Sequence, residues 1–356
     1  MKNKDKNKLN IFSNLKTEYI IIFLLITVLT VVIILSVIKG GARLVEKETP
    51  IINEENYTAY SHEYNKDMVY GEEQTPNMEN YPSDQFESVP IACWGDEFGM
   101  APNSQTPSYE AFLSRNTTRI VFNMAISNCT LETMGGRQGG LPMYIMPCDI
   151  AAKKSSTEVI LRNDYTENLN IDFSKNAGLN PCSINGIEGV LSEFDGSLKF
   201  SRNKSGFEEI ILEPTVLTTR AMEFRRGDIT VFFLGKDTDY KDINKAIDIY
   251  DKMIAYLETD NYLIIGPVSG DANTIKSVNT ALANKYGNKF LNLYDYLLNK
   301  APEEYSLTIT NSGKEQISKG IIPENYLLDS NHFNKIGAEI TANVITNKLN
   351  ELKYLK

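Results

Sequence analysis

The chain has 356 residues, of which 42% are hydrophobic, and its net charge at pH 7 is −10. This size allows one large hydrophobic core or two smaller ones. Nearly all of the excess negative charge lies between Val45 and Pro90, where nine Glu and two Asp outnumber Lys47 and Lys66, giving a local charge of −9. The rest of the chain, taken together, is close to neutral. Nothing in it suggests a nucleic-acid surface, which needs clustered Lys and Arg, so we expect no nucleic-acid partner.

The N-terminal region contains an uninterrupted apolar stretch, Ile20 to Ile38, with the length that a helix needs to cross a membrane. Five Lys residues precede it, so the positive-inside rule places residues 1–19 in the cytoplasm and the main domain outside the cell. We therefore expect a single-pass anchor at residues 20–38 in the cell membrane. A cleaved signal peptide is the alternative, because Gly40-Gly41-Ala42 offers a weak cleavage site, but its apolar region would be shorter.

Residues 39–88 are expected to form an acidic stalk. Glu and Asn are scattered there among Pro50, Pro76 and Pro82 without a helical or strand period, which is typical of a solvated linker. The Tyr residues of this segment lack the spacing of a helix that binds in a groove. We therefore expect them to contact the folded domain or the cell wall rather than to form a partner-binding motif. His62 lies in the stalk and is not expected to be catalytic.

Residues 89–352 show the pattern of a doubly wound α/β domain. A short apolar strand, a helix and a second strand follow one another, which favours parallel pairing with a right-handed crossover. Later strands are apolar throughout, as in sheets that are buried on both faces. The expected strands are 91–94, 119–124, 229–234, 262–265 and 289–293, and the expected helices are 109–114, 241–257, 274–286 and 336–352.

Residues 141–222, between the second and third of these strands, have a different pattern. Short alternating runs are separated by Gly and Asn, which predicts an antiparallel meander or small barrel. We interpret this segment as an inserted all-β subdomain that grows from a loop above the sheet, where loops of α/β folds shape ligand sites. The clearest runs are 157–161, 189–191, 197–200 and 209–212.

Two motifs at opposite ends of the domain carry the functional signal. The first strand ends in Gly95-Asp96-Glu97, and Asp329-Ser330-Asn331-His332 stands near the C-terminus. This pair resembles the first and last blocks of the SGNH/GDSL hydrolases, which have a flavodoxin-like three-layer α/β sandwich. The likeness is strongest to bacterial extracytoplasmic members with a β insertion, and the further segments that carry it are 136–142, 250–254, 264–266, 320–323, Asn334 and Gly337.

The resemblance implies a role for each site position. Such an esterase needs a hydroxyl nucleophile, a His that takes its proton and an Asp that orients the His. Its oxyanion is held by the amide of the nucleophile, by a second amide and by an Asn side chain. Asp329 and His332 match the family pattern, whereas Glu97 stands at the nucleophile position, and Asn128 and Asp237 stand at the two other oxyanion positions.

The three departures indicate a site that has lost ester hydrolysis. Glu97 is a poor nucleophile, and its longer side chain would fill the acyl position. Asn128 still offers an amide and tolerates left-handed φ. Asp237 would place a negative charge beside the oxyanion, and we expect it to share one pocket with Glu97 and His332. The alternative for Asp329 to His332 is simple capping of the last helix, since Asp, Ser and Asn are all good N-caps.

The cysteines show no metal-binding spacing, and we expect neither a metal nor another cofactor. Cys93 is expected to be a buried apolar residue. Cys148 and Cys182 could form a disulfide within the β insertion. Cys129 stands beside the expected pocket, but it is on the wrong block for a replacement nucleophile.

Three functions remain open from the sequence. The leading one is a membrane-anchored, catalytically degenerate SGNH-like domain that binds a cell-envelope glycan or an acylated ligand. The first alternative is an active esterase or deacetylase acting on cell-surface carbohydrate. The second is a structural component of an envelope complex.

Overall fold

The computed structural model describes residues 86–103, 105–163, 167–168 and 179–356. The expected cytoplasmic tail, transmembrane helix and all but the last residues of the stalk lie outside these residues. Within the described ranges, no helix combines the length and the apolar character needed to span a bilayer.

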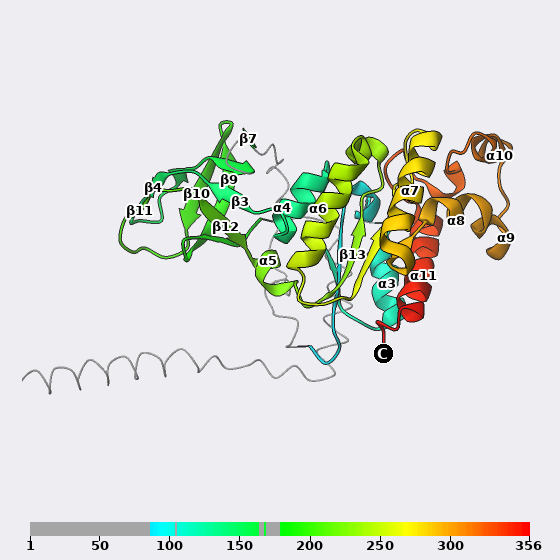
Figure 1. Ribbon diagram of the computed structural model, residues 1–356, viewed down its shortest axis with the longest axis horizontal. Helices are drawn as coiled ribbons and strands as arrows, with labels where there is room; N and C mark the ends of the chain where they lie inside the picture. The colour runs from blue at the N-terminus through cyan, green and yellow to red at the C-terminus, as the bar shows by residue number, and fades with distance from the viewer. Residues whose placement is uncertain (1–85, 104, 164–166, 169–178) are drawn as a thin grey trace, which may run out of the picture. The chain divides into compact units, whose positions relative to one another are not determined.

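The α/β domain is built on a five-stranded parallel sheet (Figure 1). The strand order is β15-β14-β13-β1-β2, which in chain order is 2-1-3-4-5, the flavodoxin-like arrangement. The predicted mixed α/β class with a parallel sheet is confirmed. The strands are β1 (Ile91–Gly95), β2 (Val121–Asn123), β13 (Ile229–Phe233), β14 (Tyr262–Ile265) and β15 (Phe290–Leu291).

Helices cover both faces of the sheet because neighbouring residues of each buried strand point to opposite faces. Cys93, Val231 and Leu263 are paired in register and enter one core cluster with the helices of the first face. On the other face, the Arg137 guanidinium lies 5.4 Å from the Trp94 ring centre. The first face carries α3 (Tyr109–Thr117), α8 (Leu293–Asn299) and α11 (Lys335–Glu351); the second carries α4 (Leu131–Gln138), α6 (Ile243–Tyr256) and α7 (Ala272–Tyr286).

The predicted long helices are present with small shifts at their ends. The apolar stripe of α6 buries Ala246, Ile249, Tyr250 and Met253, and the Asp242 side chain caps its N-terminus. Helix α4 was not predicted, because it contains two glycines and no apolar period. The short helices α5 (Arg220–Phe224), α8, α9 (Ala301–Glu304) and α10 (Asn311–Ser318) were also not predicted, and the expected strand 289–293 ends at Leu291, before α8.

The β insertion has its own sheet and core. Every strand pairing in its described part is antiparallel, and apolar side chains such as Ile145, Ile184, Phe200 and Leu217 are fully buried in one cluster. Eight strands form the order β5-β10-β9-β8-β12-β3-β6-β7, and β11 pairs with β4. The strands are β3 (Met143–Ile145), β4 (Cys148–Ile150), β5 (Thr157–Glu158), β6 (Leu161–Asn163), β7 (Glu167–Asn168), β8 (Cys182–Ile184), β9 (Ile187–Phe194), β10 (Ser197–Arg202), β11 (Glu209–Ile211) and β12 (Thr215–Thr219).

All four cysteines are free thiols. The disulfide between Cys148 and Cys182 that the sequence suggested is therefore wrong, and the insertion is held by its hydrophobic core instead. Cys93 is fully buried in β1, as predicted.

Candidate functional site

The candidate site lies at the carboxyl ends of β1 and β13, the neighbouring strands where the order of the sheet reverses. Ligands of open α/β sheets bind at this point because the loops diverge there. After β1 the chain enters a short 3-10 turn, Glu97–Gly99, and after β13 it continues through Gly235 and Lys236.

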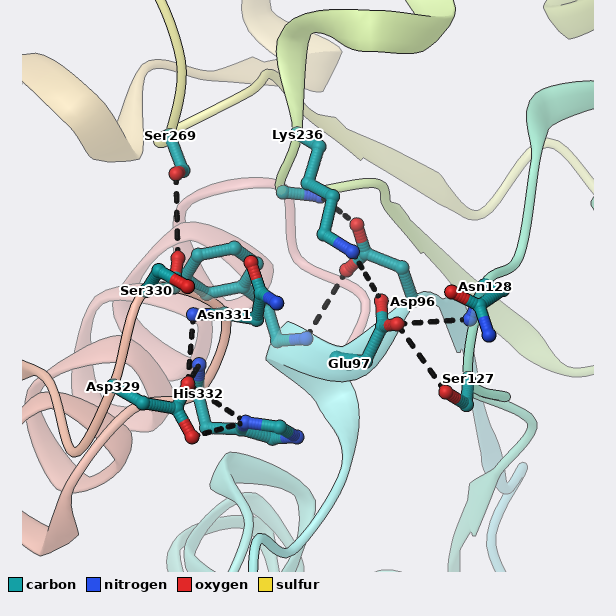
Figure 2. Close-up of polar contacts among 12 residues, drawn as sticks. Asp96, Glu97, Ser127, Asn128, Lys236, Ser269, Asp329, Ser330, Asn331 and His332 are labelled. Atoms are coloured by element: carbon teal, nitrogen blue, oxygen red, sulfur yellow. Dashed lines mark hydrogen bonds and ion pairs between the residues drawn. The ribbon is translucent and has the colours of Figure 1, made fainter.

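Asp96 ties these two loops together. Its Oδ1 accepts the Phe98 N–H at 3.1 Å, and its Oδ2 accepts the Gly235 N–H at 2.9 Å (Figure 2). Burial raises the pKa of Asp96 to about 7, although both hydrogen bonds oppose that shift. Both oxygens bind backbone of the chain itself and Asp96 is buried, so it positions the loops and is not accessible to a ligand.

The Glu97 carboxylate is held by three donors, which we call the Glu97 cradle: the Asn128 amide, the Ser127 hydroxyl and the Lys236 ammonium. Oε1 accepts the Asn128 N–H at 2.9 Å and the Ser127 hydroxyl at 3.3 Å, and Oε2 lies 2.9 Å from Lys236 Nζ (Figure 2). The Glu97 side chain is only 8% exposed.

The charge of Glu97 is fixed by this cradle. Burial acts to raise the pKa of Glu97, but the Asn128 amide and the Lys236 ammonium outweigh it and leave the pKa below its ordinary value. Glu97 is therefore ionised at neutral pH, and its negative charge lies between the three donors.

Asn128, which the sequence assigned to an oxyanion position, contacts Glu97 through its backbone N–H. Its φ of 54° is in the left-handed region, which Asn adopts more readily than most residues. In this conformation its N–H is directed at Glu97. The left-handed backbone of Asn128 thus supplies one donor of the cradle.

Among the contacts of the described residues, none joins Asp237 to Glu97. Oδ2 of Asp237 accepts the Asp271 N–H at 2.8 Å, and its carboxylate packs against Gly270, whose φ of 134° requires glycine. The preceding residue, Lys236, reaches Glu97 instead. A cation thus pairs with Glu97. The sequence did not indicate Lys236, although it directly precedes Asp237.

Asp329 and His332 form a hydrogen-bonded pair. His332 Nδ1 lies 2.9 Å from both carboxylate oxygens of Asp329 (Figure 2). Burial acts to raise the pKa of Asp329, but the Asn331 N–H and the imidazole outweigh it and lower the pKa. The N-cap of α11 is Asn334, so capping of that helix does not account for the pair. Among the contacts of the described residues, none joins His332 to Glu97.

Neither a thiol nucleophile nor a metal is supported at the site. Burial raises the pKa of the Cys129 thiol to about 12, so the thiol stays protonated at neutral pH. Within the described part of the chain, no group of three or more His, Cys, Asp or Glu side chains could hold a metal ion.

Comparisons with known proteins give a weak likeness. No protein-family model matches the chain, and no curated protein matches it. Among solved structures, the chain is similar to a protein of Desulfitobacterium hafniense assigned to the G-D-S-L lipolytic family, with 12% identity, a TM-score of 0.38, and coverage of 73% of this chain and 99% of that one. A likeness this weak does not identify an activity for the chain.

Proposed function

We propose that the chain is a catalytically degenerate SGNH/GDSL hydrolase-like protein that binds a cell-envelope glycan or an acylated ligand without hydrolysing it. The observation that supports this most directly is the Glu97 carboxylate in its cradle. The chain's own carboxylate takes the Asn128 amide, which is one of the donors that an esterase of this kind would offer to the oxyanion of its substrate.

The chemistry of ester cleavage explains why this arrangement opposes turnover. A hydrolase of this kind needs a hydroxyl nucleophile and empty donors that meet the oxyanion as its charge develops. Here the nucleophile position carries a carboxylate, and a fixed negative charge already fills the cradle. Because Glu97 already accepts from these donors, an acyl oxygen would have to displace its carboxylate to reach them.

The membrane attachment is part of the proposal and rests on the sequence. The apolar stretch 20–38, preceded by Lys residues, supports a single-pass anchor with its N-terminus in the cytoplasm. The acidic segment 39–88 would then separate the bilayer from an extracytoplasmic α/β domain.

A turnover assay on the purified full chain tests the loss of catalysis. We expect no hydrolysis of aryl acetates or acetylated sugars above the buffer rate, and no difference between the unmodified protein and His332→Ala. Hydrolysis that disappears in His332→Ala would contradict the proposal.

An active esterase or deacetylase is the second candidate, and the intact Asp329–His332 pair favours it. Such an enzyme would have to use His332 to activate water directly, because Glu97 is a poor nucleophile. Hydrolysis by the unmodified chain that is lost in His332→Ala and Asp329→Ala, but not in the exposed control Glu339→Gln, would support this candidate over the first.

A further inference from the structure

The β insertion contains a cavity of about 180 Å³ that the candidate site does not include. The insertion cavity lies between β8, the turn into β9, β12 and α5. This volume is far above the roughly 10–15 Å³ that one ordered water needs, so the cavity can hold a small organic group. Six of its nine lining residues are polar: Ser183, Glu188, Asn203, Thr218, Arg220 and Glu223.

The charges at the insertion cavity centre on Arg220. Its guanidinium lies 3.0 Å from Glu188 Oε1 and 3.8 Å from Glu223 Oε2. Two carboxylates thus accompany one cation, and this excess of negative charge opposes the binding of anions. The polar walls also offer no continuous apolar surface for an acyl chain.

We propose that the insertion cavity binds a neutral carbohydrate, a proposal that rests on the function proposed above and assigns its glycan to the insertion. Sugar hydroxyls can donate to the carboxylates of Glu188 and Glu223 and accept from the Arg220 guanidinium. The two Glu side chains are 55% and 45% exposed, so their remaining lone pairs are open to a ligand.

The walls of the insertion cavity are held in place before any ligand binds. β8 and β12 are paired through Thr218 with Ser183, and Thr219 with Cys182, inside the eight-stranded sheet. The Thr219 side chain caps α5 by accepting the Met222 N–H at 3.1 Å, which fixes the helix that carries Arg220 and Glu223. Because the side chains of a preformed site lose little conformational entropy on binding, more of their interaction energy contributes to affinity.

Titration of the detergent-solubilised full chain with trimers of N-acetylglucosamine and of glucose tests the proposal. Binding is detected by saturation-transfer NMR, and the dissociation constant is measured by calorimetry. We expect at least one trimer to bind, and we expect Arg220→Ala and the milder Asn203→Ala to weaken it, Arg220→Ala by about tenfold or more because it removes charge-assisted hydrogen bonds.

Arg226→Ala is the matched control. Arg226 is 34% exposed against 32% for Arg220, each pairs with a Glu, at 2.8 Å and 3.0 Å, and each lies over an aromatic ring. Arg226 does not line the insertion cavity, so its removal should leave sugar affinity unchanged. Thermal unfolding of each variant shows that the fold is retained.

The outcomes separate this proposal from the function on which it rests. A trimer that binds equally well to Arg220→Ala and Asn203→Ala, but not to Glu97→Ala or His332→Ala, would overturn the insertion site and leave the binding function standing. Binding of neither trimer would overturn the insertion site as well. Ester turnover by the unmodified chain contradicts the proposed function and does not bear on the cavity.

Discussion

The Glu97 cradle and the insertion cavity both contain a glutamate paired with a cation, yet they differ in access. At the sheet edge the Glu97 side chain is 8% exposed, and its oxygens accept from three groups of the chain itself. In the insertion, Glu188 and Glu223 stay about half exposed beside Arg220. The same kind of ion pair therefore closes a site when the protein supplies all of the hydrogen-bond donors to the carboxylate. It leaves the site open when part of the carboxylate stays exposed.

The largest expected effect comes from a substitution that removes the negative charge of Glu97 from the cradle. Glu97→Ser supplies a hydroxyl beside the Asn128 amide and the Lys236 ammonium, and it retains the Asp329–His332 pair. We expect p-nitrophenyl acetate hydrolysis well above that of Glu97→Ala, which opens the same space without a nucleophile. Adding Lys236→Met to Glu97→Ser should cost about 10²–10³ in rate, the usual loss for one oxyanion donor. Equal rates for Glu97→Ser and Glu97→Ala, with both variants folded, would show that the opened cradle cannot support acyl transfer.

A smaller effect concerns stability. Lys236→Met in the otherwise unmodified chain leaves the buried Glu97 carboxylate without its cation, so we expect a loss of about 1–3 kcal/mol in the free energy of unfolding. The matched control is Lys245→Met, whose ion pair with Glu132 is largely exposed and should change stability by no more than about 0.5 kcal/mol. Urea unfolding measures both, and an equal loss in the two variants would contradict the buried character of the cradle.

The next effect is a pH dependence of stability from Glu110, on α3. Burial raises the pKa of Glu110 from 4.5 to about 8, so its neutral form is favoured in the folded state. The contribution of neutral Glu110 to the free energy of unfolding is fully present below pH 4.5. It is lost as the pH rises towards 8, at up to about 1.4 kcal/mol per pH unit.

Glu110→Gln should flatten this fall, because the amide is neutral at every pH. The exposed Glu339→Gln serves as the control. Thermal unfolding between pH 5 and 8 measures the slope, and an unchanged slope in Glu110→Gln would refute the assignment.

The smallest expected effect is on the hydrolysis rate when Asp237, in the loop next to the cradle, is changed. Asp237→Asn, introduced into Glu97→Ser, should change the hydrolysis rate by less than about threefold, because the Asp237 carboxylate accepts the Asp271 N–H and has no contact with Glu97 among the described residues. The sequence alone predicts a clear gain instead, since it places that charge beside the oxyanion. Steady-state kinetics of the two proteins decides between these results.

The sequence predicted what depends on local pattern. Apolar runs identified β1 and β13, and the amphipathic period identified α6. The spacing of Asp329 and His332 indicated a pair that the structure brings within hydrogen-bond distance. Lys236 could not be predicted in the same way, because a long flexible side chain can reach across a neighbouring strand end and no sequence period records its direction.

Strand pairing across the insertion was equally beyond the sequence. β12 pairs with β3 and β8, which are far from it along the chain, so the insertion cavity is built from segments that no local pattern connects.

Labelling with a fluorophosphonate, followed by intact-protein mass spectrometry, tests the central claim most directly, because this reagent bonds to activated serines and its phosphoryl oxygen needs the oxyanion donors. If Glu97 alone closes the site, Glu97→Ser gains one adduct at position 97, the unmodified chain gains none, and adding either Lys236→Met or His332→Ala abolishes labelling. A folded Glu97→Ser protein that stays unlabelled, or an unmodified chain that is labelled as fast, would contradict the account.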